Sequence, residues 1–144
     1  MQGGSSDKAC PSGTYPTNGA SSCVAVTSAC SSSGSLPCSW GGCKFFTDAS
    51  GWLHRDGQCA STTGTLYLAS HSITALSTGV FADMGATTGL SLSSNSISIL
   101  HAGAFSGLSA LQTLSLNSNS IAVIPAGAFS GLSALQTLSL HSNS

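Results

Sequence analysis

The sequence predicts a solenoid of the α/β type with short stacked parallel strands, preceded by a small disulfide-rich segment. The first observation is an internal repeat. The unit LQTLSLNSNSIAVIPAGAFSGLSA at 111–134 has related copies one and two periods earlier and a partial copy after it. The second observation is that leucine and isoleucine hold fixed places in every copy, and the third is that all six cysteines precede the repeats. A period of this length is typical of solenoids.

The chain divides into two parts, and 144 residues suffice for one ordinary domain or a small domain with a short array. Residues 1–60 form a cysteine-rich N-terminal segment, and residues 61–144 hold three complete repeats and a truncated fourth. Because the last copy stops within a repeat, we expect an uncapped apolar edge at Leu138 and Leu140. Such an edge predicts self-association, and the truncation indicates a longer parent protein.

The cysteine-rich segment contains Cys10, Cys23, Cys30, Cys38, Cys43 and Cys59. An even number of cysteines in a small, loop-rich region predicts three disulfides, with 15 possible connectivities. A zinc site is the less favoured alternative, because no C-x-x-C pair is present and four residues separate Cys38 from Cys43. Since a solenoid must cover its first apolar edge, the position of this segment also suggests an N-terminal cap.

Each repeat is predicted to begin with a short strand that points its leucines inward. Alternation along the strand sends Leu114 and Leu116 into the core. Their equivalents in the other copies are Leu66, Leu68, Leu90, Leu92, Leu138 and Leu140. An asparagine then ends the strand, at Asn95, Asn119 and Asn143. Because its amide both donates and accepts hydrogen bonds, we expect it to satisfy backbone groups of the turn. His71 holds this place in the first repeat and is expected to do part of that work.

The return segment of each repeat is predicted to stack apolar side chains into continuous columns. The columns are Ile73, Ile97 and Ile121; Leu76, Leu100 and Ile124; Phe81, Phe105 and Phe129; Met84, Leu108 and Leu132. Glycines are expected where the backbone turns. They are Gly79, Gly103 and Gly127, followed by Gly107 and Gly131.

The repeat also matches a known consensus. The pattern L-x-x-L-x-L-x-x-N-x-L is filled in order by Leu111, Leu114, Leu116, Asn119 and Ile121. The chain from Thr63 onward therefore resembles extracellular leucine-rich repeat proteins with typical 24-residue repeats, such as receptor ectodomains and variable lymphocyte receptors. The resemblance implies a right-handed superhelix with its strands on the concave face. The opening CPSGTYPTNGASSC is similar to short cysteine-rich modules of extracellular proteins.

The outward strand positions are the candidate binding residues, because solenoids commonly bind on their concave surface. They are Thr65, Tyr67, Ser91, Ser93, Thr113, Ser115, Asn117, Thr137, Ser139 and His141. None is charged, and hydroxyl and amide groups beside an aromatic ring suit a protein or glycan ligand. We therefore expect an extracellular recognition module.

A structural component of a matrix, cell wall or filament is the alternative. It is suggested by the segment AGAFSGLSALQTLSL, which occurs unchanged at 102–116 and at 126–140. The regular Thr and Ser rows also raise ice binding as a third idea, which is less favoured because Tyr67 and Gly89 interrupt them.

Composition argues against several functional classes. The chain has three Lys or Arg and four Asp or Glu, which leaves no basic patch for nucleic acid. With four scattered Asp and no G-x-S-x-G motif, neither a catalytic triad nor a carboxylate pair is expected. His54, Arg55 and Asp56 spell the HRD of kinases without the other kinase motifs. We expect no enzyme, no cofactor and no metal.

An extracellular location requires targeting information that this sequence does not display. The start MQGGSSDKAC lacks the basic and apolar regions of a signal peptide, and the chain has no apolar run long enough for a membrane helix. Any signal or membrane anchor is therefore expected in missing sequence. No Asn-x-Ser/Thr acceptor is present, so a glycoprotein would carry its sugars on Ser or Thr.

Overall fold

The computed structural model describes residues 10–17, 22–26, 28–32 and 34–143, and these form strands and turns with no helix. The cysteine-rich segment holds β1 (Thr14–Pro16), β2 (Cys23–Ala25), β3 (Cys38–Trp40), β4 (Cys43–Thr47) and β5 (Trp52–Gly57). The repeats hold β6 (Gly64–Tyr67), β7 (Ala75–Leu76), β8 (Thr87–Ser91), β9 (Thr113–Ser115) and β10 (Thr137–Ser139).

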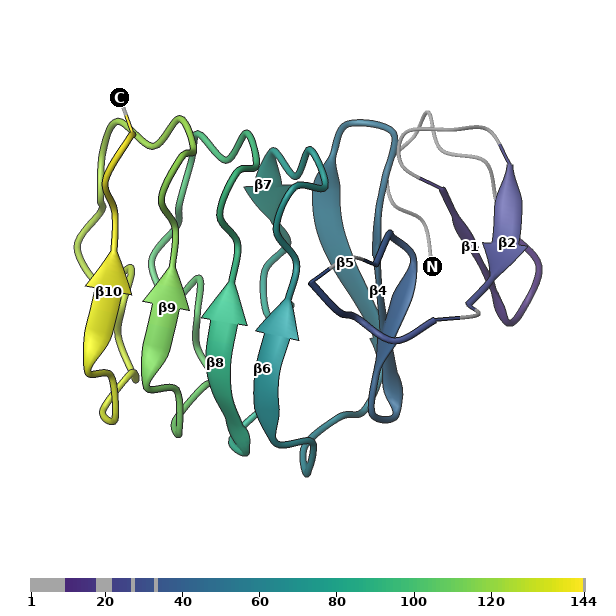
Figure 1. The fold of residues 1–144 in the computed structure, drawn as a ribbon, viewed down its shortest axis with the longest axis horizontal. Coiled ribbons are helices and arrows are strands. Elements are labelled where there is room, and N and C mark those ends of the chain that lie inside the picture. The colour runs from purple at the N-terminus through teal and green to yellow at the C-terminus, as the bar shows by residue number, and fades with distance from the viewer. Residues whose placement is uncertain (1–9, 18–21, 27, 33, 144) are drawn as a thin grey trace.

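One parallel sheet runs along the repeats, with one strand from each copy in the order β10-β9-β8-β6 (Figure 1). The register aligns equivalent leucines, Leu66 with Leu90, Leu90 with Leu114 and Leu114 with Leu138. The leucines of β6, β8 and β9 are buried, whereas Leu138 in the last strand is partly exposed. The predicted solenoid of stacked parallel strands is confirmed.

The return segments of the described repeats are turns, not the helices that the α/β type implies. In the second repeat, Ala104 N donates to His101 O and Ser106 N donates to Gly103 O. Each of these bonds joins residues three apart, as in an isolated turn. Gly103 and Gly107 lie four residues apart, both at positive φ, so less than one helical turn fits between them. A Cβ at Gly107 would stand 2.4 Å from Phe81 O, so the close stacking of turns also requires glycine there.

The phenylalanines form a continuous column through the core. Ring centroids are 6.0 Å apart between Phe81 and Phe105 and 5.7 Å apart between Phe105 and Phe129. The column continues into the cysteine-rich segment, because Phe45 of β4 lies 6.1 Å from Phe81. Both parts of the chain therefore contribute to one buried cluster.

The six cysteines form three disulfides, as predicted, and they pair in chain order. The pairs are Cys10–Cys23, Cys30–Cys38 and Cys43–Cys59. The disulfide prediction is thus confirmed over the zinc alternative.

A second sheet joins the cysteine-rich segment to the first repeat. Its order is β3-β4-β5-β7, and β5 pairs in parallel with β7, the short return strand of that repeat (Figure 1). Arg55 of β5 also donates a hydrogen bond from Nη1 to Ala82 O in the following turn. On these contacts we propose that the cysteine-rich segment is the N-terminal cap of the array.

Tyr15 in β1 makes a pH-dependent hydrogen bond that connects the β1–β2 hairpin to the β4–β5 hairpin. Its hydroxyl donates to Asp56 Oδ2 at 2.7 Å, and this bond, with burial and the charge of Asp56, raises the pKa of Tyr15 to about 12. A tyrosine in an unfolded chain titrates near 10. The folded protein therefore holds this proton more tightly, and the stability that results is present below pH ~10 and lost as pH rises toward 12.

We expect the free energy of unfolding to fall between these pH values and to fall less steeply in Tyr15→Phe. Denaturant unfolding at a series of alkaline pH values measures the slope. Tyr67→Phe, at an exposed tyrosine, is the control and should keep the wild-type slope. Equal slopes of the free energy of unfolding against pH in all three proteins would refute a contribution from the Tyr15–Asp56 hydrogen bond.

Candidate binding face

The predicted binding residues lie together on the parallel sheet and just beyond its strand ends. Thr65 and Tyr67 lie on β6, Ser91 on β8, Thr113 and Ser115 on β9, and Thr137 and Ser139 on β10, with Ser93, Asn117 and His141 two residues past their strands. All are exposed or half-buried, as outward positions require. Whether this face binds a ligand stays a prediction.

The face is uncharged, and its glycine on β8 is covered by a side chain of the neighbouring strand. Residues 84–143 contain no Asp, Glu, Lys or Arg, so β8, β9 and β10 present only neutral groups. A Cβ at Gly89 would stand 2.5 Å from Thr65 Oγ1, so the Thr65 side chain already covers the gap that glycine leaves. Tyr67 is the exposed aromatic ring of this face, and Ser91 and Ser93 lie with their hydroxyls 3.4 Å apart. The surface therefore offers hydroxyls, an amide and a ring for neutral hydrogen bonding and stacking.

An asparagine ladder fixes the end of each strand and hence the binding positions beside it. Asn119 Oδ1 accepts from Ile97 N at 3.0 Å, in the preceding repeat. Asn119 Nδ2 donates to Leu92 O at 3.0 Å, in that same preceding repeat, and to Leu116 O at 3.1 Å in its own. Asn95 and Asn143 make the equivalent bonds. The predicted role of these asparagines is confirmed.

His71 does not reproduce the ladder in the first repeat. Its side chain is buried with 8 % exposure, yet among the described residues the imidazole makes no hydrogen bond. Only its backbone N takes part, as a donor to Asn95 Oδ1 at 2.9 Å. His71 borders a small hollow at the junction with the β4–β5 turn, lined also by Thr47, Ala49, Ser50, Gly51, Ser72 and Thr74. The expectation that His71 does part of the ladder's work is therefore wrong for the imidazole.

Burial lowers the pKa of His71 below its usual value of 6.5. The unfolded chain then binds this proton more readily, so the stability that neutral His71 permits is present above pH ~6.5 and lost as pH falls through the folded pKa. We expect His71→Asn to remove this acid sensitivity and to flatten the profile of melting temperature between pH ~7 and pH ~5. His141→Asn, at an exposed imidazole, is the control. A profile that His71→Asn leaves as steep as the wild type would contradict this assignment.

Serines in the left-handed region were not anticipated from the sequence. Ser70, Ser94, Ser118 and Ser142 precede the ladder positions by one residue, and all have φ between 56° and 61°. Glycine or asparagine is the usual signal for such a backbone. Because serine is common throughout the chain, it gives no signal here.

A hydrogen-bonded chain of Asp48, His54 and Ser77 was also missed. Asp48 Oδ2 and His54 Nε2 lie 2.8 Å apart, and His54 Nδ1 and Ser77 Oγ lie 2.9 Å apart. Asp48 is buried, and its Oδ1 accepts from the backbone N of Ser50 and of Trp52. The residue types are those of a serine hydrolase triad, an arrangement that the sequence does not predict.

The surroundings of these three hydrogen-bonded residues favour a role in joining the cysteine-rich segment to the repeats. Their bonds connect the β4–β5 hairpin to the turn after β7, beside the β5–β7 pairing. The hollows around His71 and from Thr78 to Gly107 are lined by neither His54 nor Ser77.

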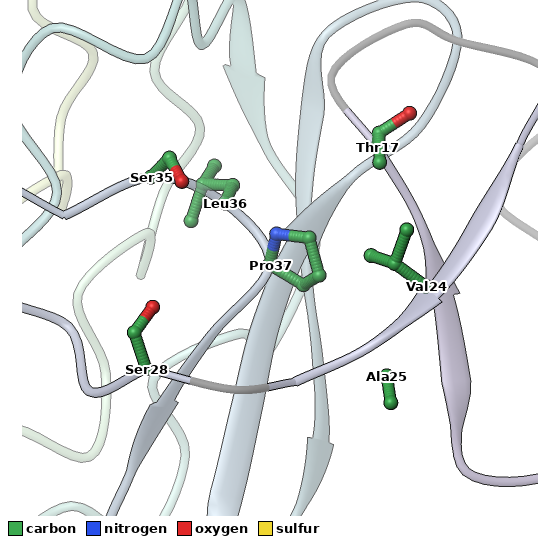
Figure 2. A pocket seen from close by; sticks show the side chains of 7 residues that line it. All are labelled: Thr17, Val24, Ala25, Ser28, Ser35, Leu36 and Pro37. Carbon is green, nitrogen blue, oxygen red and sulfur yellow. The ribbon is translucent and has the colours of Figure 1, made fainter.

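A larger hollow lies in the cysteine-rich segment, away from the strand face. Figure 2 shows its lining residues, which come from the β1–β2 hairpin and the loop before β3: Thr17, Val24, Ala25, Ser28, Ser35, Leu36 and Pro37. Its volume is about 560 Å³, and no lining side chain is charged. None of the predicted site residues borders it.

Two further searches of the described residues bear on the kind of site. No group of three or more His, Cys, Asp or Glu side chains in that part of the chain could hold a metal ion. Nor does that part contain a helix of the length and apolar character needed to cross a membrane.

Comparison with known proteins agrees with the repeat geometry. The family model for leucine-rich repeats matches residues 62–121 and 109–144, which together cover more than half of the chain. No curated protein matches the chain. Since the consensus, the parallel sheet and the asparagine ladder agree with the family match, the chain belongs to the leucine-rich repeat family.

Proposed function

We propose that the protein is an extracellular recognition module that binds a protein or a glycan through the outward face of β6, β8, β9 and β10. Leucine-rich repeat proteins generally mediate protein binding. The observation that carries the proposal is the uninterrupted uncharged face, on which hydroxyls, one amide and Tyr67 lie on strands held by the asparagine ladder. Three disulfides support a location outside the cell, where such bonds persist.

The face is suited to ligands that are recognised by shape and neutral hydrogen bonds. With no charge on the repeats beyond Met84, electrostatic steering contributes little to binding here. We therefore expect the Kd of a ligand to agree within about twofold between low and high salt. A steep salt dependence would place the site near Lys44 and Arg55 in the cysteine-rich segment.

The test is a binding screen followed by two matched variants. The chain is screened against an array of neutral glycans and a panel of purified extracellular protein domains. Ser115→Arg places a long charged side chain in the middle of the face, and Ser106→Arg places the same side chain on an exposed turn away from it. We expect Ser115→Arg to weaken binding at least about tenfold, a loss of ~1.4 kcal/mol, and Ser106→Arg to leave it unchanged. Equal affinities for both variants would refute the proposed face.

A structural component of a matrix, cell wall or filament is the second candidate. The identical segments at 102–116 and 126–140 favour it, because a building block needs uniform repeats rather than varied ones. Native mass of the protein from its source separates the two functions. A discrete small species favours recognition, whereas a very large assembly favours the structural function. Because the six cysteines pair within the chain, we expect such an assembly to be held by non-covalent contacts and to persist when reductant is added.

A further inference from the structure

Half of the large exposed apolar side chains of the described residues fall in one row, away from the strand face. The six such residues are Trp52, Tyr67, Ile99, Ile124, Val123 and Leu138. Of these, Ile99 and Val123 are the most exposed, at 69 % and 71 %, and Trp52 is 46 % exposed.

These three residues are aligned by the stacking of the coils. Trp52 pairs with Ala75 across β5 and β7, and their neighbours Leu53 and Leu76 are buried, so Trp52 and Ala75 face outward together. Ile99 and Val123 are the equivalents of Ala75 in the next two repeats. The row is therefore Trp52 of β5 followed by Ala75, Ile99 and Val123, one from each of the three repeats. At about 4.8 Å between neighbouring positions it is roughly 14 Å long.

The side chains of this row match the same row read in reverse. Their sizes run large, small, large and medium. Two copies placed antiparallel about a two-fold axis between the second and third positions set Ala75 against Ile99 of the second copy. The same axis sets Trp52 against Val123 of the second copy. Each small position then receives a large side chain, which is the self-complementarity that a two-fold interface requires.

Charge and size favour a second copy as the occupant. Beside Ala75, Ile99 and Val123, the adjoining outward positions are Thr74, Ser98 and Ala122 on one side and Ser77, His101 and Pro125 on the other. None of these is an acid, Lys or Arg, so two copies meet without like-charge repulsion. A standard interface buries about 800 Å² per partner, and four side chains cover less than that, so the flanking rows must also be covered. We expect the resulting interface to fall short of the standard size and to give a weak, reversible dimer.

We propose that the row Trp52, Ala75, Ile99 and Val123 is a homodimerisation surface, in which Ala75 of each chain receives Ile99 of the other. It lies on a different surface from the proposed ligand-binding face. Dimerisation would therefore leave β6, β8, β9 and β10 of both copies free to bind.

The test measures the monomer–dimer equilibrium by sedimentation over about 1 to 500 μM, the range where a weak dimer dissociates. Ile99→Ala and Ala75→Ile are each expected to raise the dissociation constant at least about tenfold. Ile99→Ala removes the side chain that packs on Ala75 of the second copy, and Ala75→Ile fills the space that this side chain would occupy. The double variant exchanges the two residues and is expected to restore dimerisation to within about threefold of the wild type. Tyr67→Ser, on the strand face, is the control and should leave the equilibrium unchanged.

Three results would overturn the proposal. One is a wild-type chain that remains monomeric across the whole range. Another is a dimer that Ile99→Ala does not weaken. The third is a tighter dimer in Ala75→Ile, which is what non-specific association through added apolar surface would give. Melting temperatures of all variants verify that each is folded.

Discussion

Phe105→Ala is expected to lower the free energy of unfolding by about 3 to 5 kcal/mol, the usual cost of removing a fully buried phenylalanine. Phe105 has no exposed surface, and it stacks on Phe81 at 6.0 Å and on Phe129 at 5.7 Å. Its removal leaves a cavity in the middle of the column, and the flanking rings each lose a partner. Since every coil depends on its neighbours for burial, we expect the whole array to melt at a lower temperature. Calorimetry or thermal circular dichroism measures the shift.

Two controls separate the column from general loss of aromatic surface. Tyr67→Ala removes a ring of similar size from the exposed strand face and should change the stability little. Phe129→Ala, at a partly buried position of the same column, should cost less than Phe105→Ala. If Phe105→Ala melts with the wild type, the register of the repeats is not the one described.

The repeat region was largely predictable because each of its features recurs in every copy. The inward leucines, the glycines at positive φ and the asparagine ladder all occupy positions that repeat. Each assignment is therefore supported by the equivalent residues of the other copies. Two expectations within the period are wrong. At His71 the residue changes and the imidazole lacks the geometry of the amide. Ile124, predicted in a buried column with Leu76 and Leu100, is 42 % exposed in the last repeat. The absence of helix in the described return segments follows from two positive-φ residues spaced too closely to admit one, both glycines except for Asp83 in the first repeat.

The cysteine-rich segment was predictable only in outline, because nothing in it repeats. Even cysteine number predicted three disulfides but left 15 pairings open. The contribution of Phe45 to the phenylalanine column depends on the pairing of β5 with β7, a contact between distant parts of the sequence that no local pattern signals. The Asp48, His54 and Ser77 chain was missed for the same reason, since it exists only once the hairpin lies against the first repeat.

Asn119→Ala is the second large effect, and we expect it to cost about 2 to 4 kcal/mol. The loss is dominated by Ile97 N, which donates to Asn119 Oδ1 at 3.0 Å and would be left without an acceptor in the buried interior. The two main carbonyls suffer less. Leu92 O still accepts from Asn95 Nδ2, and Leu116 O still accepts from Asn143 Nδ2. The bonds that Asn119 donates are thus duplicated by its neighbours, whereas the bond that its Oδ1 accepts from Ile97 N has no substitute. An acceptor at this position therefore matters more than a donor.

Asn117→Ala provides the matched control, since it removes the same amide two residues earlier from an outward position. The Asn117 side chain makes no hydrogen bond to the described residues, so its removal should change the free energy of unfolding by less than about 0.5 kcal/mol. Denaturant unfolding of the two variants compares them directly, and equal losses would contradict the ladder's role. The pair also separates stability from recognition. If the strand face binds a ligand, Asn117→Ala should weaken binding in a fully stable protein. Asn119→Ala should destabilise the fold and weaken binding only to the extent that the strand end moves.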